Sequence, residues 1–180
     1  MNLSRRSLIK YTPAIGIGIA GCSSNGGSDD FDTSESNEEV DSDNDGVPDT
    51  EDDYPNDSSR NEQLRDVSDS RNIQEDEWYY YPLNFTQDGY IEYNFIVRDG
   101  PPIDAILIDE SEYDSYESGE RNLQYTEISS YDSAGDSVES PISSGNYRLI
   151  FDNSSRGRAE PPTDFDNNVA EVEFDITTSQ

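Results

Sequence analysis

Apolar and polar side chains alternate over short stretches in the carboxy-terminal part of the chain. The clearest stretch lies at residues 168–177, where Ala170, Val172, Phe174 and Ile176 alternate with acidic side chains. Successive side chains of an extended strand point to opposite faces, so this pattern predicts a strand with one buried and one solvated face.

The same alternation recurs and is interrupted by turn sequences that contain glycine. It predicts further strands at residues 78–85, 90–98, 103–109, 123–130, 137–139 and 147–151. Between two of them, residues 111–119 predict a short helix that Ser111 caps and Gly119 ends. Short, evenly spaced strands are typical of an all-β protein, and we expect a single antiparallel β-sandwich of about seven or eight strands over residues 73–177.

The amino-terminal pattern is different. Arg5 and Arg6 precede a weakly apolar run that ends at Cys22, and this run is much shorter than the roughly 20 apolar residues of a membrane-spanning helix. Residues 1–21 resemble the twin-arginine export signal and lipobox of bacterial and archaeal lipoproteins. The resemblance implies that Cys22 becomes the lipid-bearing amino terminus and holds the protein to the outer face of the cell membrane.

Charge changes the picture of the surface. The chain has 41 Asp and Glu against 11 Lys and Arg, a net charge of −30, and no lysine follows Cys22. This composition resembles that of proteins from extreme halophiles, in which molar salt screens self-repulsion. It excludes nucleic acid as a partner, because phosphates require basic residues. Residues 22–40 contain only Phe31 and Val40 as large apolar side chains after Cys22, so a disordered acidic tether is expected there.

Oxygen-bearing residues recur at fixed spacing in residues 41–55. They occupy positions of a loop that bends at Gly46, where the absence of a Cβ makes a positive φ cheap. The predicted ligands are Asp41, Asp43, Asp45, Asp49 and Asp52, together with the backbone carbonyl of Val47. Calcium prefers six to eight oxygen ligands, so the spacing predicts a Ca²⁺ site.

This loop resembles that of an EF-hand and, more closely, the thrombospondin type 3 repeat, because no helix is expected on either side. Residues 56–72 return to a polar composition and are interpreted as a linker. Two later stretches, residues 103–109 and 144–153, are similar to strands of the pre-peptidase C-terminal and GOLD-like β-sandwiches of secreted proteins. Those modules are non-catalytic, which implies a binding or supporting role for the sandwich.

Catalysis has few chemical options in this chain. It contains no His, and its single Cys is assigned to lipid, so the usual nucleophile and base pairs are absent. A carboxylate pair of the glycosidase type is the remaining alternative. We therefore expect a protein that is not an enzyme.

Three further features bear on partners. Aromatic side chains could form a platform for sugar rings; they are Trp78, Tyr79, Tyr80, Tyr81, Tyr113, Tyr116, Tyr125 and Tyr131. Arg156 and Arg158 form a basic pair for which pairing with acids is the competing interpretation. Glycosylation sequons begin at Asn56, Asn84 and Asn153. The sequence thus predicts a calcium-binding surface lipoprotein with a surface protein or a glycan as partner, or alternatively a carbohydrate-binding accessory module of a hydrolase or transporter.

Overall fold

The computed structural model describes residues 39–120, 126–161 and 167–180, and Glu38–Gln180 form one compact unit. The predicted export signal with Arg5 and Arg6, the lipid site Cys22 and nearly all of the tether lie outside the described residues. Within the part that is described, no helix is long and apolar enough to cross a bilayer.

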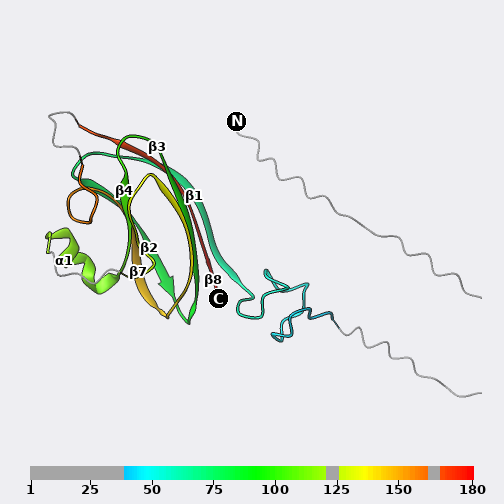
Figure 1. Ribbon diagram of the computed structural model, residues 1–180. Coiled ribbons are helices and arrows are strands. Elements are labelled where there is room, and N and C mark those ends of the chain that lie inside the picture. The colour runs from blue at the N-terminus through cyan, green and yellow to red at the C-terminus, as the bar shows by residue number, and fades with distance from the viewer. Residues whose placement is uncertain (1–38, 121–125, 162–166) are drawn as a thin grey trace, which may run out of the picture. The chain divides into compact units, whose positions relative to one another are not determined.

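Two antiparallel sheets of four strands pack face to face (Figure 1). The first sheet has the order β1-β8-β3-β6, and its strands are β1 (Gln63–Ile73), β8 (Ala170–Ser179), β3 (Gly89–Asp99) and β6 (Gly135–Ile142). The second has the order β2-β7-β4-β5, with β2 (Glu77–Phe85), β7 (Gly145–Asn153), β4 (Ile103–Asp109) and β5 (Ser130–Ser133). The predicted all-β sandwich is confirmed.

The main core lies between the sheets and uses alternate residues of each strand. Ile91, Tyr93 and Phe95 of β3 are buried there, as the alternation predicted. Phe151 of β7 stacks on Phe174 of β8 with ring centroids 4.6 Å apart. Buried aromatic pairs contribute about 0.5–1.5 kcal/mol beyond their apolar area, so this contact joins the two sheets firmly.

A second apolar cluster lies on the outer face of the β4 sheet. The 3-10 helix η1 (Glu110–Glu112) and the helix α1 (Tyr113–Glu117) cover Ile106, Ile108 and Ile150 there with Tyr113 and Tyr116. The predicted short helix is therefore present, but Ser111 does not cap it: the Asp109 side chain caps η1 by accepting a bond from the Ser111 N–H, and α1 has no side-chain cap.

The predicted linker at residues 56–72 is wrong in its second half. Residues from Gln63 onward form β1, which pairs along its length with β8, so the sandwich spans residues 63–179 and not 73–177. Only a few residues of this edge strand are apolar, and polar or charged side chains occupy the other positions. The sequence therefore shows no regular apolar alternation that would predict a strand there.

The other strands match their predicted bounds to within two residues at each end, apart from two. The weak strand expected at residues 137–139 is the longer β6, which pairs with β3. The strand expected at residues 123–130 lies partly outside the described residues, and Ser130 instead begins β5.

Candidate metal site

The predicted calcium loop folds back on itself through backbone bonds to its own carboxylates. Asp41 accepts hydrogen bonds from the N–H groups of Asn44 (2.7 Å) and Gly46 (3.1 Å). Both donors have a left-handed backbone, with φ of 64° at Asn44 and 99° at Gly46. Asparagine and glycine tolerate this conformation best, and the bend places the alternate aspartates on one side of the loop.

Three of the predicted ligands lie together. Asp41, Asp43 and Asp45 each offer a carboxylate oxygen within 4.8 Å of the others. Burial, together with the charges of Asp45 and Asp52, raises the pKa of Asp43 even though bonds from backbone N–H groups oppose the shift. Negative charge is thus concentrated at one point of the loop.

Two oxygens of the loop are buried without a hydrogen-bond partner. They are the Oδ2 atoms of Asp43 and Asp52. Asp52 as a whole is only 8% exposed. A buried carboxylate oxygen without a partner is costly unless a proton or a cation satisfies it. An all-oxygen donor set of this charge fits a hard divalent cation such as Ca²⁺.

The remaining predicted ligands are placed differently. Both carboxylate oxygens of Asp49 accept bonds from Ser42, one from its N–H and one from its Oγ, each at 2.7 Å. Asp49 therefore closes the loop rather than joining the three-carboxylate cluster. The Val47 N–H donates to Asp45 Oδ1, and the role of the Val47 carbonyl as a ligand stays a prediction.

The segment after the loop attaches to the sandwich through Arg60, which the sequence analysis did not select. Its guanidinium forms ion pairs with Asp57 and with Glu139 of β6, both at 2.9 Å. It also lies over the rings of Tyr54 (4.5 Å) and Tyr90 of β3 (5.2 Å). Burial lowers the pKa of this guanidinium, but the two acids outweigh that effect and raise it, so Arg60 stays charged.

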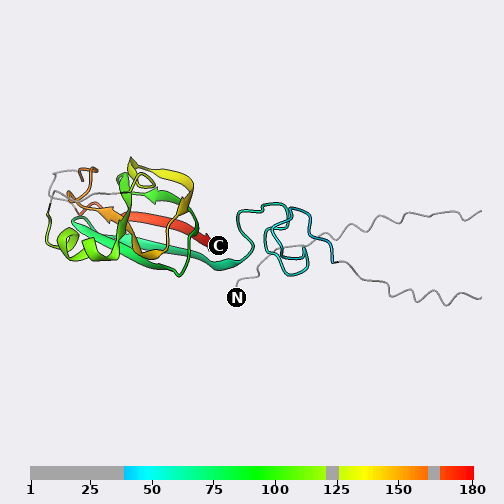
Figure 2. The same cartoon turned by 90° about the horizontal axis from the view of Figure 1, so that it is seen from below.

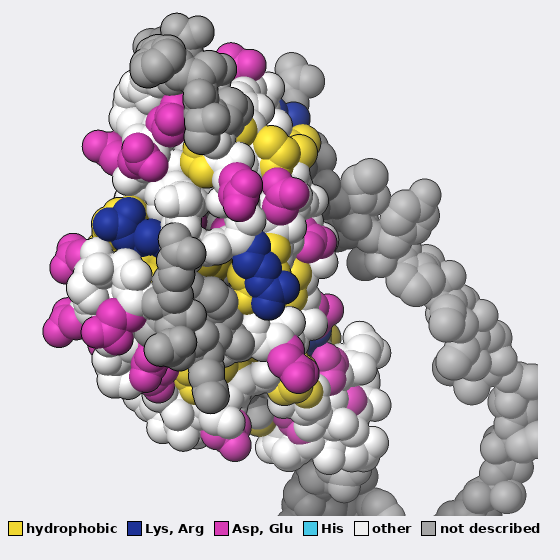
Figure 3. All heavy atoms as spheres, turned by 60° about the vertical axis from the view of Figure 1, so that its left-hand side comes forward, with side chains coloured by type: hydrophobic (Ala, Val, Ile, Leu, Met, Phe, Trp, Pro, Cys, Tyr) yellow, Lys and Arg dark blue, Asp and Glu magenta, His cyan; other side chains and the backbone are white. Residues whose placement is uncertain are grey.

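Arginine side chains cover the candidate sugar platform. Arg156 lies 4.2 Å from the ring centroid of Trp78, and Arg148 lies 3.6 Å from that of Tyr113. The other pairs are Arg148 with Tyr80, Arg65 with Tyr81, Arg71 with Tyr79 and Arg158 with Tyr131. Figure 3 shows arginines lying on hydrophobic side chains of the face that carries α1, with acidic groups around them.

Each of these guanidiniums occupies one face of its ring, and Tyr116 is only 1% exposed, whereas Tyr80 is 37% exposed. The carbohydrate platform stays a prediction. Tyr125 lies outside the described residues. The predicted basic pair has its own roles, because Arg156 donates to the Glu117 carbonyl (3.4 Å) as well as stacking on Trp78.

One carboxylate pair of the second sheet is closed to solvent. Asp104 of β4 and Asp152 of β7 are direct cross-strand partners, and both are fully buried. Asp104 accepts from the N–H groups of Asp132 (2.7 Å), Arg158 and Ala159 (2.9 Å). Because both are buried, a glycosidic bond cannot reach them. Their role is structural, since the bonds to Asp104 hold the 154–159 loop over the sheet.

The three sequons differ in exposure. Asn56 and Asn84 are exposed, whereas Asn153 is fully buried. Its Nδ2 donates to the carbonyls of Ile73 (3.0 Å) and Asn168 (2.7 Å). The prediction for Asn153 is therefore corrected, because a glycan on that nitrogen is incompatible with the folded sandwich.

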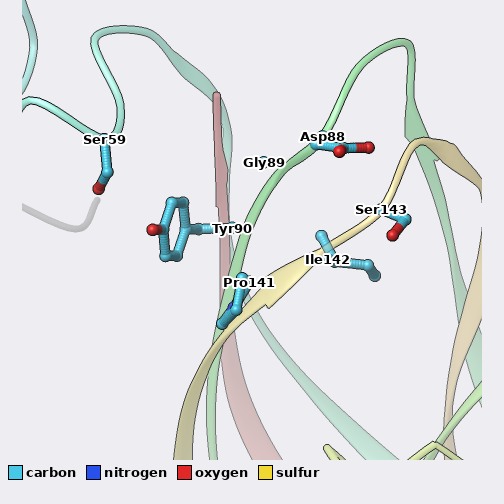
Figure 4. A pocket seen from close by; sticks show the side chains of 7 residues that line it. All are labelled: Ser59, Asp88, Gly89, Tyr90, Pro141, Ile142 and Ser143. Carbon is cyan, nitrogen blue, oxygen red and sulfur yellow. The ribbon is translucent and has the colours of Figure 1, made fainter. Parts of the chain in front are cut away.

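A hollow of about 420 Å³ lies where Ser59 approaches the ends of β3 and β6. Figure 4 shows its side chains, and the Asp88 carboxylate points away from Tyr90. Asp88 instead accepts from the Ser144 N–H at 2.8 Å. Small-molecule sites have polar groups that converge on the ligand, and this hollow does not have that arrangement.

No family model matches the chain, and a search of curated proteins found no match. Among solved structures, the chain is similar to the pre-peptidase C-terminal domain of collagenase from Bacillus anthracis, with 14% identity, a TM-score of 0.42 and coverage of 62% of this chain and 88% of that chain. It is also similar to a structure described as Bacillus endospore appendages that form disulfide-linked pili, with 13% identity, a TM-score of 0.32 and coverage of 67% and 92%. These similarities concern the fold only.

Proposed function

We propose that this chain is a non-catalytic, calcium-binding surface lipoprotein whose β-sandwich serves as a binding, adhesion or assembly module. The observation that carries the calcium assignment is the pair of buried, unpartnered oxygens on Asp43, a member of the three-carboxylate cluster, and on Asp52, whose charge acts on Asp43. Ca²⁺ would supply charge neutralisation and a fixed centre for the loop, and the aspartates would hold it.

The anchoring part of the proposal comes from the sequence. Arg5 and Arg6 would direct export by the twin-arginine route, and lipid on Cys22 would attach the mature chain to the outer face of the membrane. The sandwich would then contact a neighbouring surface protein. A glycan partner is the alternative, and it would have to use ring surface that the arginines leave open, as at the exposed Tyr80.

Calcium binding is tested by melting the mature chain in molar salt with calcium and with chelator. A ligand at 100 times its Kd stabilises the folded state by about 2.7 kcal/mol, so calcium is expected to raise the Tm by several degrees. A chain with both Asp43→Asn and Asp45→Asn is expected to lose this response, while Asp66→Asn on the exposed part of β1 keeps it. Equal melting of the native chain in both conditions would refute the calcium assignment.

Anchoring is tested separately by membrane fractionation of cells that express the full chain. The native chain is expected in the membrane fraction and a Cys22→Ala chain in the soluble fraction. Finding the native chain unlipidated in the cytosol would contradict the lipoprotein assignment. The partner is tested separately: cross-linking in intact cells should capture a protein neighbour of the sandwich.

A further inference from the structure

Asn61 lies outside the twelve-residue loop but reaches into it. Its Nδ2 donates to Asp45 Oδ2 at 3.1 Å, across a separation of 16 residues. The other oxygen of that carboxylate, Oδ1, accepts from the Val47 N–H at 2.7 Å. One member of the carboxylate cluster is therefore held from two sides, by the loop itself and by Asn61.

The backbone of Asn61 belongs to the sandwich. Its N–H donates to the carbonyl of Gln180 (2.8 Å), and its own carbonyl accepts from the Asp53 N–H (3.0 Å). Glu62 and Gln180 also exchange two backbone bonds, at 2.9 and 3.0 Å. Figure 2 shows this segment beside the carboxy-terminal end of the chain. The Asn61 backbone is thus tied to Gln180, which follows β8, and to Asp53 at the end of the calcium loop.

Arg60 fixes the same segment from the other side. Its ion pair with Glu139 and its position over Tyr90 tie it to β6 and β3, and its side chain is only 17% exposed. Contacts from β6, from β3 and from the residue after β8 therefore converge on residues 60–62, and from there the Asn61 side chain donates to Asp45.

We propose that Asn61 is a positioning residue of the calcium site, through which the folded sandwich sets the orientation of Asp45. This inference rests on the calcium binding proposed above. Hydrogen-bond donors behind a metal ligand orient it, and their loss usually weakens metal binding 10–100-fold. Because coupling between two events is reciprocal, calcium also stabilises the sandwich and not the loop alone.

The test uses the mature chain with Asn61→Ala, and calcium alone as the probe. Titration calorimetry in molar salt gives the Kd, and Trp78 fluorescence reports unfolding of the sandwich with calcium and with chelator. We expect a Kd that is 10–100-fold weaker and a smaller Tm response to calcium, with a near-native Tm in chelator. Asn56→Ala is the matched control, since Asn56 is exposed in the same segment, and it should behave like the native chain.

A second variant guards against a fold defect. Asn61→Gln keeps the amide and the backbone contacts but displaces the donor by one methylene, and it should show the same loss of affinity. A Kd within twofold of native in either folded variant overturns the inference, as does an equal loss in Asn56→Ala. Failure of the native chain to bind calcium overturns the proposed function instead, so the two failures are distinguishable.

Discussion

Replacing Asp152 by asparagine is expected to stabilise the sandwich at neutral pH. Asp152 is fully buried beside Asp104, and its Oδ1 has no hydrogen-bond partner. Burial is the main cause that raises the pKa of Asp152 to about 6, and the charge of Asp104 adds to it. Hydrogen bonds from Ser154, Tyr116 and the Gly157 N–H oppose this shift. The ionised carboxylate is therefore an unfavourable species in the folded protein.

The sign and size of the effect follow from this raised pKa. The folded state holds the Asp152 proton more tightly than the unfolded chain, whose carboxyl titrates near 3.8. The stability contributed by this group is greatest below pH 4, declines as the pH rises to about 6, and then stays constant. Two pKa units correspond to about 3 kcal/mol. Asparagine resembles the neutral carboxyl and does not titrate, so Asp152→Asn should gain up to this amount at pH 7.

The assay is urea unfolding in molar salt at a series of pH values, followed by the fluorescence of Trp78, the single tryptophan. The difference in unfolding free energy between Asp152→Asn and the native chain should grow between pH 4 and 6. Asp66→Asn, at an exposed position of β1, is the control and should show no such slope. Both changes create an N-x-S sequence, so a host without N-glycosylation is used. A flat difference for Asp152→Asn would refute the reasoning.

Two other substitutions test the packing around the same sheet. Gly157→Ala would place a Cβ only 1.9 Å from Asp104 Oδ2; thermal melting should show a loss of about 1–3 kcal/mol, and an unchanged Tm would contradict the close approach. Arg148→Leu removes a two-pronged contact with Glu110, at 2.7 and 2.5 Å, and the stacking on Tyr113. It should cost about 1–2 kcal/mol and keep most of this cost in molar salt, whereas a loss confined to low salt would mean that only screened charge was involved.

Strands with one clean apolar face could be predicted from the sequence. In the middle of β3 and β8 apolar residues stand at every second position, as at Ile91, Tyr93 and Phe95 of β3, and burial in the core follows directly from that period. Strand β1 could not be predicted in the same way. As an edge strand it pairs with β8 along one side only, and the charged residues Asp69 and Arg71 stand at half-buried positions, where an apolar residue would be expected.

The candidate site shows a similar division. Local spacing was enough to bring Asp41, Asp43 and Asp45 together, because a short loop determines their separation. It could not reveal the role of Asn61, whose position depends on a bond to the last residue of the chain. The burial of Asp104 likewise depends on the pairing of β4 with β7, which are far apart in the sequence. The residues next to Asp104 therefore could not predict it.

The arginines have a consequence for how separate molecules meet. Six of the seven arginines in the described part of the chain lie over an aromatic ring, with the guanidinium carbon 3.9 to 5.7 Å from the ring centroid. The positive charges are therefore used in contacts within the molecule, while the acidic residues determine its electrostatic potential at a distance. Separate copies would therefore repel one another in dilute buffer and tolerate close spacing in molar salt.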